Sequence, residues 1–317
     1  MAVETRATPW RRLVRRVAGR EGAYRRGHGR VALLFLLPDL IPFFVFTVLG
    51  VLATGGLSFT HWDLVSPPAP AGLRNYQDLF SDDVFRQVLG NTAAYTLGVV
   101  PLSTALALLV ALGLARKLPG AILLRTAYFA PYITTLVASA LVFQWIYDPR
   151  AGLIDSALYA IGVQNPPGWL NSTTWALPAL IIFGVWRQIG FNIVLFLAGL
   201  QGVDRSLLDA AAVDGAGPWR RFRYVTLPLI SPTTFFVVVV TTISSFQVFD
   251  QAYIMTNGRF SPDNATNTLV GYLFQKAFVS ASANIGLASA TAGVLFLLVF
   301  AVTVLQFAVQ RRWVHYE

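Results

Sequence analysis

Long runs of apolar residues, separated by shorter polar segments, fill most of this chain. Six of them carry almost no charge, and they cover residues 31–57, 88–115, 126–147, 174–202, 225–249 and 285–309. Each run is longer than the ~20 residues that an α-helix needs to cross a bilayer core about 30 Å thick. The pattern therefore predicts an all-α, polytopic membrane protein with six transmembrane helices.

The polar segments give the predicted domain organisation. A basic tail covers residues 1–30, a membrane domain covers 31–312, and a short second tail covers 313–317. Within the membrane domain, the segment 203–224 between the fourth and fifth runs differs from the other connections. It alternates charged residues with good helix formers, and we expect it to have a function outside the membrane.

The distribution of positive charge predicts the orientation. The chain is 55% hydrophobic and only 12% charged, against about 25% charged residues in soluble domains. Of its 24 Lys and Arg residues, 18 lie in the N-terminal tail, the second and fourth polar segments and the C-terminus, whereas five lie in the alternate segments. The positive-inside rule then places both termini in the cytoplasm. The Arg-rich tail is typical of a segment that binds anionic lipid headgroups, and nucleic-acid binding is not expected.

The segment 203–224 predicts two short helices joined by a turn. Asp204 suits the N-cap of a helix that runs to residue 213. Gly215 supplies the left-handed conformation that ends a helix. Pro218 then starts a second helix to about residue 224, and Pro228 opens the fifth run.

The first of these helices is predicted to dock onto a partner protein. Its consecutive alanines leave a smooth, low-profile face flanked by charges, which suits a groove on another chain. An amphipathic helix lying on the lipid surface is the alternative. The residues expected to contact the partner are Asp209, Ala210, Ala211, Asp214, Gly215, Ala216 and Arg220.

Polar residues inside the apolar runs are candidates for a solute pathway. A charged residue such as Arg187 costs about 2.5–3.5 kcal/mol at the centre of a membrane helix. Together with Gly184, Gln188 and Phe191 it occupies one helical face, and cationic, amide and aromatic groups together suit a sugar. The alternative is that Arg187 pairs with Asp39 or Asp250.

The fifth run adds Thr241 and Ser245 on a shared face, followed by Gln247. Hydroxyl groups at such positions also serve as contacts between membrane helices, and that alternative stays open here.

The sequence offers no sign of catalysis. It contains no Cys, its three His residues are scattered, and neither lysine lies in a phosphate-binding Gly-rich loop. We therefore expect no metal, no cofactor and no enzymatic activity in this chain. If transport is driven by ATP, the ATP and its Mg²⁺ are expected on a separate ATPase.

One stretch resembles a known family. Residues 208–216, Leu-Asp-Ala-Ala-Ala-Val-Asp-Gly-Ala, followed by Leu227-Pro228, resemble the cytoplasmic "EAA" loop of ABC-importer permeases, with Asp209 in place of the usual Glu. Further similar stretches are Gly90-Asn91-Thr92, Ala130-Pro131-Tyr132, Trp186 to Asn192, Leu200-Gln201, Ser245 to Asp250 and Thr256-Asn257-Gly258. Together they resemble the carbohydrate-uptake branch, of the maltose and glycerol-phosphate permease type.

The resemblance implies a type I ABC-importer permease fold with the EAA coupling helix in the 203–224 loop. It implies a second homologous permease, a dimeric ABC ATPase and an extracytoplasmic solute-binding protein as partners, in the cytoplasmic membrane of a prokaryote. It also implies that Tyr132 lies near the transported sugar. Glycerol-3-phosphate or another polyol phosphate is the alternative solute. A secondary transporter is a further alternative, but it leaves the coupling loop unexplained.

Overall fold

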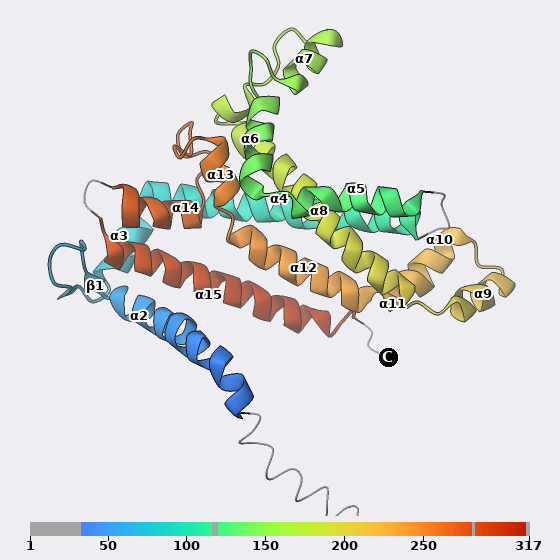
Figure 1. Ribbon diagram of the computed structural model, residues 1–317, viewed down its shortest axis with the longest axis horizontal. Helices are drawn as coiled ribbons and strands as arrows, with labels where there is room; N and C mark the ends of the chain where they lie inside the picture. The colour runs from blue at the N-terminus through green and yellow to red at the C-terminus, as the bar shows by residue number, and fades with distance from the viewer. Residues whose placement is uncertain (1–32, 116–119, 281–282, 315–317) are drawn as a thin grey trace, which may run out of the picture. The chain divides into compact units, whose positions relative to one another are not determined.

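A computed structural model describes residues 33–115, 120–280 and 283–314 (Figure 1). About three-quarters of these residues are helical, and the only strands among them are the antiparallel pair β1 (Thr60–His61) and β2 (Ala69–Pro70). The predicted all-α class is therefore confirmed. The predicted tail 1–30, the basic residues Arg116 and Lys117, and residues 315–317 of the second tail lie outside the described residues.

The described chain divides after Gly56 into two units. The first contains an apolar helix, Leu33–Leu57, except for its last residue, and no residue of the most apolar part of this helix is buried. It includes a π-helical turn, η1 (Phe43–Val48), and ends as α2 (Leu49–Leu57). The π-turn begins directly after Pro42, whose missing N–H interrupts regular α-helical bonding.

The second unit holds three more helices that are long and apolar enough to cross a membrane. They are α4 (Asp83–Leu114), α8 (Ala176–Gln201) and α15 (Ile285–Gln310). Two bent pairs of helices add to these, and counting each pair as one span gives the predicted number of six among the described residues.

The first bent pair is α5 (Ala121–Ile133) with α6 (Leu136–Ile146), which meet at 95°. The sequence predicted one continuous helix over 126–147, and the structure corrects this. Thr134 and Thr135 at the break have extended backbone angles, with ψ of 141° and 133°. Pro131 in the last turn of α5 removes one helical N–H donor, which weakens the helix at this point.

The second bent pair corrects the prediction for the fifth run. The helix that starts at Pro218 does not end near residue 224 but continues through α10 (Pro218–Arg221), η3 (Phe222–Thr226) and α11 (Leu227–Leu229). A bend of 65° then leads into α12 (Ser231–Phe246). Pro232, in the first turn of α12, marks the start of this helix, whereas Pro228 follows a π-helical turn that accommodates its missing N–H.

Helix α8 lies among α4, α5 and α12, which pack on different sides of it (Figure 1). Small residues allow the close approach: a Cβ at Gly190 would collide with the backbone carbonyl of Tyr128 on α5. Ala107 and Ala111 of α4 pack with the buried Phe196 of α8 in the same way. Membrane helices commonly associate through such small residues, because lipid supplies no hydrophobic driving force between them.

Short elements occupy the ends of the long helices. The segment 203–224 contributes α9 (Arg205–Val213), which lies with α10 at one end of the second unit, while α3 (Arg74–Ser81) and the β1–β2 pair lie at the other (Figure 1). The remaining elements are α7 (Leu153–Ala160), η2 (Trp169–Asn171), α13 (Asp250–Met255), α14 (Leu269–Phe274) and η4 (Gln275–Val279).

Candidate functional site

A polar cavity of about 270 Å³ lies between α4, α6, α8, α12 and α13. It brings together five of the predicted pathway residues, which come from two separate apolar runs: Gly184, Arg187, Gln188, Ser245 and Gln247. The lining is completed by Tyr95, Val99, Leu136, Ser244, Val248, Phe249, Asp250 and Gln251. The cavity thus combines guanidinium, amide, hydroxyl and carboxylate groups with aromatic rings.

Arg187 is held at the break between α5 and α6. Its Nη1 donates to the backbone carbonyl of Thr134 at 3.1 Å and to that of Pro131 at 3.4 Å. These carbonyls belong to the last turn of α5, where helical carbonyls lack intrahelical partners and the helix dipole favours a cation. None of the ion pairs among the described residues involves Arg187, so the alternative pairing with Asp250 is not found.

Gly184 gives the cavity room for Tyr95. A Cβ at position 184 would collide with the Tyr95 hydroxyl and would lie 3.0 Å from a methyl group of Val99. The same hydroxyl accepts a hydrogen bond of 3.0 Å from Nε2 of Gln251, at the start of α13. The glycine therefore allows α4 and α8 to approach each other and lets Tyr95 reach the edge of the cavity.

Thr241 does not line the cavity. It is buried, and its hydroxyl lies 3.4 Å from both Oδ1 of Asn192 and Nε2 of Gln188. Asn192 in turn donates to the Ser103 hydroxyl at 3.3 Å. This network joins α4, α8 and α12 inside the membrane region. Thr241 thus holds helices together, which was the alternative reading of its hydroxyl.

The predicted residues Tyr132 and Phe191 form a pair of their own. Their rings stack with centroids 4.8 Å apart and planes inclined by 23°. The stack joins α5 to α8 beside the cavity, but neither ring is among the residues that line it. Phe191 therefore does not share the environment of Gly184 and Arg187, although helical spacing places it on the same side.

Several residues that line the polar cavity were not predicted from the sequence. Tyr95 lies in an apolar run, where a tyrosine gives little signal by itself. Gln251 and Ser244 flank the stretch Ser245 to Asp250, which does resemble the family pattern, so extending that stretch by one residue at each end would have found them.

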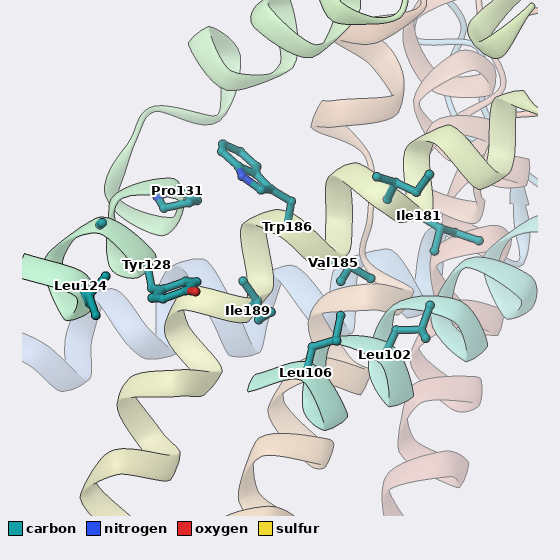
Figure 2. A pocket seen from close by; sticks show the side chains of 11 residues that line it. Leu102, Leu106, Leu124, Tyr128, Pro131, Ile181, Val185, Trp186 and Ile189 are labelled. Carbon is teal, nitrogen blue, oxygen red and sulfur yellow. The ribbon is translucent and has the colours of Figure 1, made fainter. Parts of the chain in front are cut away.

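A larger groove, of about 690 Å³, lies between α4, α5 and α8 (Figure 2). Leu102 and Leu106 of α4, Tyr128 of α5 and Val185 and Ile189 of α8 are among its residues. Apart from the Tyr128 hydroxyl and the indole N–H of Trp186, the groove presents no side-chain hydrogen-bonding groups. A hydrophilic solute would lose its hydrogen bonds there, so the smaller polar cavity is the better candidate for passage.

The segment 203–224 forms as the sequence predicted as far as the turn at Gly215. The Asp204 carboxylate accepts a hydrogen bond of 2.9 Å from the N–H of Ser206, which caps α9 and holds the pKa of Asp204 below its usual value. Gly215 has φ of +77°, and Ala216 N–H donates to the Ala211 carbonyl at 2.9 Å. This is the Schellman arrangement that glycine at this position permits.

All seven predicted coupling residues lie in or beside α9 and α10. Asp209, Ala210, Asp214, Gly215 and Arg220 are exposed, while Ala211 and Ala216 are half-buried. Two apolar side chains that were not predicted stand out among them, because Val213 is 89% exposed and Trp219 is 70% exposed. Tryptophan is enriched in protein–protein interfaces, so the exposed Trp219 is the more informative of the two.

Comparisons with known proteins agree with this arrangement. The family model for the binding-protein-dependent transport system inner membrane component matches residues 22–315. The chain is 38% identical over 285 residues to the probable ABC transporter permease protein YesP of Bacillus subtilis (strain 168), covering 89% of this chain and 91% of that protein. It is 35% identical to the lactose transport system permease protein LacF of Rhizobium radiobacter, covering 76% of this chain and 81% of that protein.

A solved structure shares the fold. The crystal structure of a bacterial ABC transporter involved in the import of the acidic polysaccharide alginate matches with a TM-score of 0.75 at 20% sequence identity, covering 92% of this chain and 99% of that one. The family match, the several apolar helices and the shared fold together make this a multi-pass membrane protein. The chain belongs to the family of inner-membrane components of binding-protein-dependent transport systems.

Proposed function

We propose that this chain is the permease subunit of an ATP-driven importer and carries a sugar through the polar cavity. The cavity is the observation that supports the solute class. Arg187, Gln188 and Ser245 offer hydrogen bonds to sugar hydroxyls, and Phe249 offers an apolar ring face. The related lactose permease supports the same class.

Five of the eight residues that the sequence indicated line the proposed pathway, and the other three support it from outside the cavity. Gly184, Arg187, Gln188, Ser245 and Gln247 contact the solute directly. Tyr132 and Phe191 form a stacked wall beside the cavity, and Thr241 positions Gln188. In this role each polar group replaces part of the hydration shell that the sugar leaves behind on entering the membrane.

ATP is hydrolysed on partner chains. This chain supplies α9 and the following turn as the element that seats in a groove of a dimeric ATPase, through Asp209, Ala210, Ala211, Asp214, Gly215, Ala216 and Arg220. Closure of the ATPase then moves α9 as a rigid body and switches the permease between inward-facing and outward-facing states. A second homologous permease completes the pathway, and an extracytoplasmic binding protein delivers the solute.

The orientation follows from charge. The positive-inside distribution supports cytoplasmic termini and a cytoplasmic α9. The cavity then opens towards the binding protein in one state and towards the cytoplasm in the other.

A polyol phosphate such as glycerol-3-phosphate is the second candidate solute. The observation in its favour is the guanidinium of Arg187 at the cavity, because arginine binds phosphate in a bidentate manner. Two of its hydrogen bonds already go to backbone carbonyls, which favours a neutral sugar.

The test is uptake into vesicles that contain this chain, its second permease and the ATPase, with the binding protein outside. We expect ATP-dependent uptake of a radiolabelled sugar that the binding protein retains, and no uptake without ATP. Uptake of glycerol phosphate but of no sugar would select the second candidate. Uptake driven by an ion gradient without ATP would contradict the proposal.

A further inference from the structure

A second polar pocket lies where α4 ends and α5 and α9 begin. Its volume is about 350 Å³, and it is lined by two arginines, Arg125 on α5 and Arg205 at the start of α9. Gln201 and Thr226 add an amide and a hydroxyl, and the rest of the wall is apolar: Leu112, Ala115, Leu197, Leu200, Val203 and Leu208. It shares no residue with the polar cavity between α4, α6, α8, α12 and α13.

The positive charge of this pocket is uncompensated within the described part of the chain. No described carboxylate lines it, and neither arginine takes part in an ion pair among the described residues. Asp204, next to Arg205 in the sequence, uses its carboxylate to cap α9. The pocket is therefore electropositive and suited to an anion.

Arg125 is already positioned for such an anion. Its Nη2 donates to the carbonyl of Leu114 at 3.2 Å, which fixes the guanidinium against the end of α4. Its Nε is buried and has no hydrogen-bond partner within the described residues. Because Nε is shielded from solvent, a phosphate would be bound by the other guanidinium N–H groups of Arg125, which have no further hydrogen-bond partner among the described residues and would donate charge-assisted hydrogen bonds.

We infer that this pocket binds the phosphate of an anionic phospholipid. Two guanidinium groups match a phosphate diester, and the leucine-rich wall matches the glycerol and the first methylene groups of the acyl chains. The apolar helices α4 and α8 end at the pocket, which places it at headgroup depth. The assignment of the lipid to the inner leaflet rests on the orientation given under the proposed function. The binding of the phosphate by the two arginines does not depend on that orientation.

Such a lipid would connect the membrane to the coupling helix. Arg205 and Leu208 belong to α9, while Arg125 and Leu112 belong to α5 and α4. A bound headgroup would thus tie α9 to the membrane helices without direct contact between Arg125 and Arg205.

The experiment is native mass spectrometry of the purified complex, titrated in detergent with phosphatidylglycerol, with phosphatidylcholine or with inorganic phosphate. We expect a larger fraction of the complex to carry bound phosphatidylglycerol than bound phosphatidylcholine at the same lipid concentration. Inorganic phosphate should not displace the bound phosphatidylglycerol. Arg125→Gln should lower phosphatidylglycerol retention about tenfold and Arg205→Gln several-fold, because each removes a charged hydrogen-bond donor. Arg223→Gln, at an exposed arginine of the same loop outside the pocket, is the matched control and should change nothing.

Arg125→Lys is the control for misfolding, because it keeps the positive charge and should keep part of the lipid binding. The inference is overturned if Arg125→Gln retains as much phosphatidylglycerol as the wild type. It is equally overturned if inorganic phosphate displaces the bound phosphatidylglycerol. It is also overturned if the variants keep the lipid but lose the ATPase, because the pocket would then receive an acidic side chain of the partner. Lipid retention is read without any transport, so its failure is separate from a failure of the proposed function.

Discussion

The guanidinium of Arg187 on α8 donates a hydrogen bond of 3.1 Å to the backbone carbonyl of Thr134, where α5 gives way to α6. One side chain therefore lines the polar cavity and stabilises the 95° break in the third apolar run. We therefore expect the removal of the Arg187 side chain to affect both the cavity and the geometry of the break.

We predict that Arg187→Ala lowers both uptake and stability. The carbonyls of Pro131 and Thr134 would lose charged hydrogen bonds worth about 1.5–3 kcal/mol each, and the cavity would lose its cation. ATP-dependent uptake in vesicles should fall at least tenfold, with a lower thermal midpoint of the complex. Arg187→Lys should recover part of the stability but not of the uptake, because a lysine cannot present the planar fork of an arginine. Arg150→Ala, at an exposed loop position, is the control. Full uptake by Arg187→Leu would remove Arg187 from the pathway.

The exposed carboxylate of Asp209 leads to a prediction on coupling. Asp209→Arg should leave insertion and yield of this subunit unchanged but lower co-purification of the ATPase by tenfold or more, because charge reversal in a docked contact costs a few kcal/mol. Pull-down through a tag on this chain measures the ratio. Asp78→Arg on α3, at the other end of the second unit, should retain the ATPase. If Asp209→Arg binds the ATPase like the wild type, α9 is not the docking element.

The contact between Gly184 and Tyr95 gives a test of packing at the cavity. Gly184→Ala forces the new methyl group against the Tyr95 hydroxyl, and such overpacking typically costs about 1–3 kcal/mol. Tyr95→Phe removes the colliding oxygen, so the double variant should be more stable than Gly184→Ala alone. Thermal unfolding of all three variants in detergent measures the interaction between the two sites. Additive effects would show that the two side chains do not meet.

Asp82 at the N-terminus of α4 predicts a dependence on pH. Partial burial works against its charge, but hydrogen bonds from the Tyr272 hydroxyl at 2.6 Å and the Val84 N–H, with nearby Lys276, hold the pKa of Asp82 below its usual value. A carboxyl with a depressed pKa in the folded state stabilises the fold above its unfolded pKa, and this stabilisation is lost as the pH falls through the folded value. Stability should therefore be constant above about pH 5 and decline below about pH 4.

Two variants isolate this effect. Asp82→Asn should lower the stability at neutral pH and flatten its decline in acid, and Tyr272→Phe should cost about 1.5–3 kcal/mol at neutral pH. The thermal midpoint of the complex between pH 3 and pH 7 provides the measurement. An unchanged acid profile in Asp82→Asn would assign the decline to other carboxylates.

The absence of cysteine allows a clean test of topology. Gln164→Cys, at an exposed position after α7, should react with a membrane-impermeant maleimide on intact cells. Ala212→Cys on α9, in cells without the ATPase, should react only after permeabilisation. The reverse pattern would invert the orientation and place α9 outside, where no ATPase can reach it.

Much of this protein could be predicted from local sequence. Charge-free runs of more than ~20 residues have few options besides crossing a membrane as helices, because lipid satisfies no backbone hydrogen bonds. The cap at Asp204 and the turn at Gly215 depend on neighbouring residues alone, and both formed as predicted. The family also followed from a local stretch, residues 208–216 with Leu227-Pro228, and the family match confirms it.

The breaks and the side-chain environments depended on tertiary structure. Inside a membrane both the lipid-facing and the protein-facing sides of a helix are apolar, so periodicity placed Phe191 with Arg187 although only Arg187 lines the cavity. Arg187 donates a hydrogen bond to Thr134, which lies 53 residues earlier in the chain, and the hydroxyl of Thr241 contacts Asn192, which lies 49 residues earlier. The sequence by itself thus determined the long apolar helical segments, the cap and turn of α9, and the family to which the chain belongs. Only the packing of α4, α5, α8 and α12 decided which polar groups meet, because those contacts join residues that no local pattern connects.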